Sequence, residues 1–158
     1  MRALLIVAGL VLVLGVTTFQ IVRKEAVLRS GTTVLLELAP VDPRSLIQGD
    51  YMRPDYALAR SQAAAVSWPR DGQLVVAVGH DDVARSVRRH TGGSLAPGEH
   101  LLRYRVRDRR LRIATDAYYF QEGHQQQFAK AKYGELKVDA SGDPILVGLR
   151  DSNLRPLR

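Results

Sequence analysis

The chain has 158 residues and no cysteine, and 23 lysine and arginine residues against 16 aspartate and glutamate residues give a formal net charge of +7. This length suits one domain with one hydrophobic core, and the lack of cysteine excludes disulfides, thiolate metal sites and cysteine nucleophiles. A basic balance is compatible with anionic lipid, nucleic acid or an acidic partner, and it carries no information about the fold.

An uncharged apolar segment begins at Ala3 and ends at Val22. At about 1.5 Å per helical residue it is long enough to cover the roughly 30 Å hydrocarbon core of a bilayer. It is longer than the apolar part of a cleaved signal peptide, and no small-x-small cleavage site follows it. No face of it is polar, which disfavours a buried helix of a soluble protein. We therefore predict an uncleaved signal anchor over residues 1–24, with a cleaved signal peptide as the alternative.

Basic residues flank the apolar segment on both sides. Arg2 precedes it, and Arg23, Lys24 and Arg29 follow it. The positive-inside count is nearly balanced and slightly favours a cytoplasmic C-terminal domain. A very short basic tail before a single apolar helix is, however, the usual form of an export signal. We expect the domain to lie outside the cytoplasm.

Short strand patterns follow the anchor. Residues 25–31 predict a linker that continues the helix briefly and ends at a glycine, and residues 33–38 predict a strand. A proline-containing loop leads to an extended run over residues 49–59, where Pro54 cannot donate to a strand ladder and so indicates an edge strand or a bulge. Later segments predict a helical turn at 61–65, strands at 73–79, 83–87, 118–123, 136–138 and 145–147, a short helix or linker at 124–132, and a mobile polar tail at 151–158.

The clearest pattern is an alternation of apolar and basic side chains over residues 102–107. A period of two is typical of a half-buried antiparallel strand, and the turn and apolar positions after it predict a β-hairpin. Many short strands with regular turns predict a mainly β fold, a single small antiparallel β-sandwich or barrel-like domain over residues 32–150 behind one N-terminal transmembrane helix. The alternation sets Leu102, Tyr104 and Val106 on one face and Arg103, Arg105 and Arg107 on the other.

Candidate catalytic residues are weakly supported. Asp42, Asp50 and Asp55 stand beside proline or glycine, where aspartate usually accepts hydrogen bonds from turn amides. The four histidines lack the spacing of metal ligands, and no phosphate-binding glycine loop occurs. We predict no catalytic residues, no metal and no cofactor, and we regard an enzyme as the less favoured class.

Two alternatives to a binding protein remain open. Residues 43–50 loosely resemble a stretch of membrane-anchored signal peptidases, in which a nucleophilic serine precedes the proline. No serine stands there in this chain, and nothing indicates a base for Ser45, so a membrane-anchored serine hydrolase is the enzyme alternative. The other is an anionic-lipid-binding module that uses Arg103, Arg105 and Arg107. Nucleic acid is not expected as a partner outside the cytoplasm.

Residues 49–56, GDYMRPDY, resemble the motif of the bacterial GDYXXLXY family. Residues 40–46, 119–123 and 133–138 also resemble that family, whereas Pro54 stands where the family has leucine. The resemblance implies a membrane-anchored domain of unassigned function that works beside polytopic membrane proteins, and it supplies no catalytic residues. Together with the expected export of the domain, the resemblance leads us to expect a single-pass protein of the bacterial inner membrane, with its C-terminal domain in the periplasm.

These observations lead to a hypothesis of a membrane-anchored extracytoplasmic binding or assembly subunit that partners a polytopic membrane protein. On a regular strand Tyr51 and Tyr56 would face opposite sides, and a bulge at Pro54 would bring them together. The predicted binding patch consists of Gly49, Asp50, Tyr51, Arg53 and Tyr56. A secondary patch consists of Tyr119, Phe120, Glu122 and Gly123.

Overall fold

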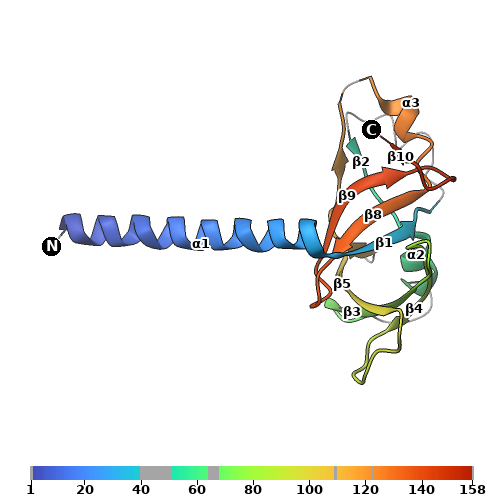
Figure 1. The fold of residues 1–158 in the computed structure, drawn as a ribbon, viewed down its shortest axis with the longest axis horizontal. Helices are drawn as coiled ribbons and strands as arrows, with labels where there is room; N and C mark the ends of the chain where they lie inside the picture. The colour runs from blue at the N-terminus through green and yellow to red at the C-terminus, as the bar shows by residue number, and fades with distance from the viewer. Residues whose placement is uncertain (1, 40–50, 64–67, 109, 122, 158) are drawn as a thin grey trace.

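The computed structural model describes residues 2–39, 51–63, 68–108, 110–121 and 123–157. One long helix, α1 (Arg2–Ser30), projects from a domain in which the strands gather around its C-terminal end (Figure 1). The most apolar stretch within Leu4–Ser30 has a mean hydropathy of 2.5, and none of that stretch is buried against the rest of the protein. By length and composition, α1 can cross a membrane, which agrees with a single-pass anchor.

The helix continues almost to the first strand. The Gly31 N–H donates to the Val27 carbonyl at 2.8 Å, and β1 begins at the next residue. Residues 25–30 are therefore the last turns of α1, as the helical pattern predicted, and no irregular linker separates helix and domain.

Two antiparallel four-stranded sheets form the domain. The first has the order β1-β8-β9-β10, which are Thr32–Glu37, Tyr133–Val138, Pro144–Arg150 and Pro156–Leu157. The second has the order β4-β3-β5-β6, which are Ala84–Arg89, Asp71–Val78, Glu99–Arg107 and Arg110–Ile113. A two-stranded pair, β2 (Tyr51–Met52) with β7 (Tyr118–Tyr119), and the helices α2 (Ala57–Ala63) and α3 (Gln125–Phe128) complete the domain.

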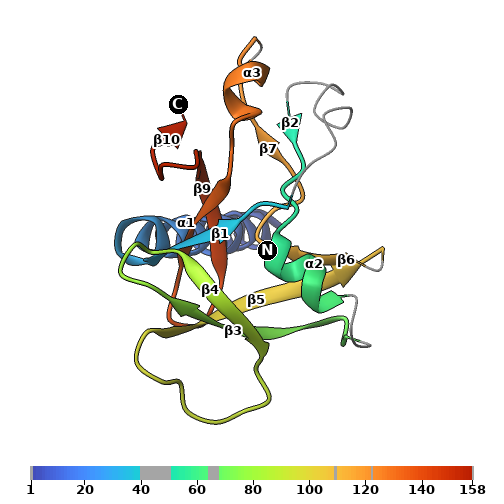
Figure 2. The same ribbon diagram turned by 90° about the vertical axis from the view of Figure 1, so that its right-hand side faces the viewer.

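The two curled sheets face each other, with β1 and β9 above β3 and β5 in Figure 2. Backbone hydrogen bonds join them at two places, from the Leu35 N–H to the Asp82 carbonyl (2.8 Å) and from the Arg103 N–H to the Gly142 carbonyl (2.7 Å). The predicted mainly β, barrel-like domain behind one N-terminal apolar helix is confirmed.

The core lies between the sheets. The alternation predicted for β5 is present, because Leu102 and Tyr104 are buried while Arg103 and Arg105 are exposed. β6 pairs with β5 to complete the predicted hairpin. Tyr104 meets the ring of Trp68 edge to face at 5.3 Å. The core cluster includes Val34, Leu36, Met52, Tyr56, Leu74, Val76, Leu102, Tyr104, Ile113, Phe128, Leu136 and Leu149.

Three local predictions need correction. The extended run predicted to reach residue 59 ends earlier, because α2 begins at Ala57 with helix-favouring residues. The strand predicted over 118–123 ends at Tyr119. In place of a mobile tail at 151–158, the chain turns back and adds β10 to β9. The Asp151 carboxylate stabilises that turn by accepting hydrogen bonds from the backbone N–H groups of Asn153 and Arg155.

Candidate functional site

The segment after residue 50 reaches the surface beside an aromatic strand. Tyr51 of β2 pairs with Tyr119 of β7 in antiparallel register, and their ring centroids lie 5.7 Å apart. The Arg53 guanidinium carbon lies 5.9 Å from the centre of the Tyr51 ring, within cation–π range. Tyr51, Arg53 and Tyr119 therefore form one surface group, called here the motif cluster.

Tyr119 of this cluster is largely exposed to solvent. Its side chain is 76% exposed, although an aromatic residue in a small domain is usually at least half buried. An open groove of about 440 Å³ lies beside it, and Asp116 at its edge is within 3.9 Å of Arg107 and 3.6 Å of Arg112. The groove is lined by Tyr51, Arg53, Arg107, Asp108, Arg112, Asp116, Ala117 and Tyr119.

Tyr56 lies elsewhere. It is 2% exposed and belongs to the core, where its ring packs against the backbone of Gly134 in β8. Burial raises the pKa of its hydroxyl, which has no hydrogen-bond partner within the described part of the chain. The structure therefore does not bring Tyr56 to the surface beside Tyr51, as the predicted patch required. Gly49 and Asp50 lie outside the described residues.

The secondary patch is divided in a similar way. Tyr119 joins the motif cluster, whereas Phe120 is half-buried, with its ring 4.8 Å from that of Phe128. Gly123 is exposed in a turn with φ of 86°, a conformation that favours glycine. Glu122 lies outside the described residues.

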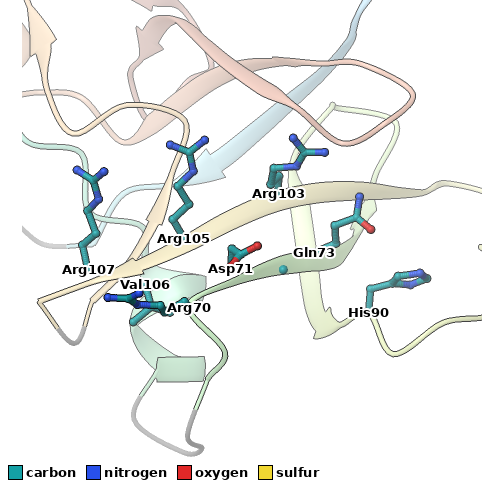
Figure 3. A pocket seen from close by; sticks show the side chains of 9 residues that line it. Arg70, Asp71, Gln73, His90, Arg103, Arg105, Val106 and Arg107 are labelled. Carbon is teal, nitrogen blue, oxygen red and sulfur yellow. The ribbon is translucent and has the colours of Figure 1, made fainter.

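A second surface feature is strongly basic. Arg103, Arg105 and Arg107 project from the same side of β5 over an open groove of about 910 Å³ (Figure 3). Arg70, just before β3, and His90, just after β4, also line the groove. The sequence pattern predicted the three β5 arginines but missed Arg70 and His90. Their proximity depends on strand register, which local spacing does not reveal.

The family model of GDYXXLXY proteins matches residues 13–149. The chain belongs to the GDYXXLXY family. No curated protein and no solved structure matches it. The resemblance seen at residues 49–56 is thereby confirmed over most of the chain.

The motif that gives the GDYXXLXY family its name is divided between two environments here. Its first tyrosine, Tyr51, lies in the motif cluster, and its last, Tyr56, is part of the core. Among the described residues, no group of three or more histidine, aspartate or glutamate side chains is placed to hold a metal ion. Asp42 and Ser45, weighed above for acid–base or hydrolase chemistry, lie outside the described residues.

Proposed function

We propose that this GDYXXLXY protein is a membrane-anchored binding or assembly subunit, and that the motif cluster is its docking surface for a polytopic membrane protein. The observation that carries the proposal is the 76% exposed Tyr119, which lies against Tyr51 in a cluster with Arg53. We further propose that the domain lies on the periplasmic side of a bacterial inner membrane.

The composition of the motif cluster supports a protein partner. Tyrosine and arginine are enriched among residues that dominate protein–protein binding energies. Tyrosine adds a large contact area at a low cost in side-chain entropy, and arginine held over a tyrosine ring is already partly ordered before binding. The charged edge at Arg107, Arg112 and Asp116 supplies the polar rim that surrounds such sites.

The anchor supports a partner in the same membrane. A helix such as α1, with its apolar side chains exposed from Leu4 to Val22, restricts the domain to the bilayer surface. Confinement raises the effective concentration of membrane neighbours far above that of soluble proteins. A moderate docking surface is then sufficient for a stable complex.

Site-specific cross-linking tests the proposal. A photo-reactive phenylalanine analogue in place of Tyr119 of the full chain, expressed in bacterial cells, is expected to form one cross-linked product with an integral membrane protein. Arg53→Ala should reduce that product several-fold, because it removes the cation over Tyr51. The same analogue in place of Tyr133, a half-buried tyrosine of β8, is the control and should not form the product. A Tyr119 product that is unaffected by both Arg53→Ala and Tyr51→Ala would refute docking through the motif cluster.

Membrane orientation has its own test. A reporter that is active only outside the cytoplasm, fused after Arg158, should be active. A matched cytoplasmic reporter should be inactive. The reverse pattern would place the domain in the cytoplasm, as the slight excess of basic residues after the apolar segment favours.

A further inference from the structure

The basic face of β5 meets the proposed docking surface only at Arg107, and its other arginines lie outside that surface. Arg103, Arg105 and Arg107, called here the arginine row, occupy alternate positions of one strand and project to the same side (Figure 3). Alternate residues of a strand are about 7 Å apart. The row is therefore a line of separate guanidinium groups, each able to bind a different anionic group.

The charges of the row are poorly compensated. In the described part of the chain, neither Arg103 nor Arg105 has a carboxylate within ion-pair distance. Among the described carboxylates, Arg107 reaches only that of Asp116, over a long distance of 3.9 Å. Cationic residues outnumber carboxylates among the residues that line the two grooves along the row, even though Asp71, Asp116 and Asp143 are present.

The row lies next to the end of the anchor. A groove of about 310 Å³ is lined by the arginine row together with Lys24 of α1. The Lys24 ammonium lies 3.0 Å from the Asp143 carboxylate, and Arg23 lies 3.7 Å from Asp139, so the helix contacts the turn between β8 and β9. In the same turn, the Gly142 carbonyl accepts a hydrogen bond from the Arg103 N–H of β5. β5 lies at the end of the domain from which α1 projects (Figure 1).

This position corresponds to the headgroup layer of the membrane. The uncharged part of α1 ends at Val22, so Lys24 lies just beyond the hydrocarbon core when the helix spans it. The polar headgroup layer is roughly 5–7 Å deep on each side of a bilayer. Side chains that share a groove with Lys24 are therefore within reach of lipid phosphates.

We propose that the arginine row binds the phosphate groups of anionic phospholipids in the leaflet from which α1 emerges, and that it holds the domain in a fixed orientation against the membrane. Guanidinium groups bind phosphate oxygens in a two-pronged geometry that neutral side chains cannot reproduce. An anionic leaflet also attracts basic residues near its surface. The proposal requires α1 to span the membrane, but it is independent of the protein partner.

The experiment compares the full chain in nanodiscs of phosphatidylcholine alone with nanodiscs that also contain phosphatidylglycerol. Trp68, the only tryptophan, packs on Tyr104 of β5, so its fluorescence during urea unfolding reports the core beneath the row. Phosphatidylglycerol should lower the unfolding equilibrium constant of the wild-type domain by about tenfold or more, because the folded strand presents the three guanidinium groups to the headgroups together, whereas the unfolded chain separates them. Added salt should diminish the effect.

Matched variants separate the arginine row from general charge effects. Arg103→Gln with Arg105→Gln should abolish the phosphatidylglycerol effect, and neither residue lines the groove beside the motif cluster. Arg85→Gln with Arg155→Gln removes the same charge from β4 and the C-terminal turn and should retain the effect. If the first double variant unfolds in phosphatidylcholine discs, Arg103→Lys with Arg105→Lys replaces it and should retain the charge attraction but weaken the response.

Three outcomes would overturn the proposal. Equal stability of the wild type in both kinds of nanodisc would show that the row does not bind anionic headgroups. Stabilisation by inorganic phosphate in phosphatidylcholine discs, without a response to phosphatidylglycerol, would assign the row to a soluble phosphorylated ligand. The same pattern with a single-stranded oligonucleotide would assign it to nucleic acid.

Discussion

Tyr56 provides a direct test of whether the last motif residue serves the core or a binding surface. Its side chain is 2% exposed, and its hydroxyl lacks a hydrogen-bond partner in the described part of the chain. Tyr56→Ala removes most of a side chain that buries roughly 150–250 Å². With the cavity that remains, the free energy of unfolding should fall by about 3–5 kcal/mol.

Tyr56→Phe separates the ring from the hydroxyl. Burying a hydroxyl without a partner costs about 1–3 kcal/mol, so its removal should leave the domain as stable as the wild type or more stable by about 1 kcal/mol. The assay is urea unfolding of the full chain in detergent micelles, followed by Trp68 fluorescence. The cross-link from position 119 should persist in Tyr56→Phe, because the motif cluster does not include Tyr56.

The result that refutes this reasoning is a loss of more than about 1 kcal/mol in Tyr56→Phe, which would mean that the hydroxyl is hydrogen-bonded in the folded protein. A Tyr56→Phe variant that folds normally but loses the cross-link would instead return Tyr56 to the binding surface.

Two further predictions concern stability. Gly72→Ala should destabilise the domain by about 1–3 kcal/mol, because the new methyl carbon would lie 2.6 Å from the Tyr104 hydroxyl on the paired strand. Gly148→Ala is the control and should cost less than about 0.5 kcal/mol, because its methyl carbon would make an ordinary contact of 3.7 Å. Equal losses of unfolding free energy for the two variants in urea would contradict the packing argument. Two hydrogen bonds of 2.9 Å from Arg150 hold the pKa of Glu135 below its usual value, so this pair adds stability above the unfolded-state pKa of about 4.3 and loses it as the pH falls through the lower folded-state value. Glu135→Gln should therefore cost about 1–2 kcal/mol at neutral pH and progressively less in acid, and a constant difference between variant and wild type across that range would argue against the ion pair.

Much of the fold was predictable because its signals are local. The alternation over residues 102–107 predicted β5 and its buried face, and the uncharged stretch before Arg23 predicted α1. The apolar pattern of β1 likewise agrees with burial of Val34, Leu35 and Leu36 to 1% exposure or less. Each of these features follows from side-chain periodicity within one segment.

Other features depend on contacts between distant segments. β1 pairs with β8, about a hundred residues further along the chain, and no local pattern specifies that partner. The short strand β10 was missed because its two residues are stabilised by pairing with β9 and by the Asp151 turn. Burial of the last motif tyrosine could not be predicted for the same reason, because Tyr56 packs against Gly134 of the distant strand β8.

Because α1 leads directly into β1, the anchor helix fixes the rotation of the domain about the helix axis. Each residue of an α-helix turns its axis by about 100° and advances about 1.5 Å. Only Gly31 separates α1 from β1. The number of residues between the membrane and that glycine therefore sets the direction in which each face of the domain points around the helix axis. A neighbouring protein at a fixed position around the helix would therefore contact one particular face of the domain. A single residue inserted between the membrane and Gly31 would rotate that face by about 100°, away from the neighbour.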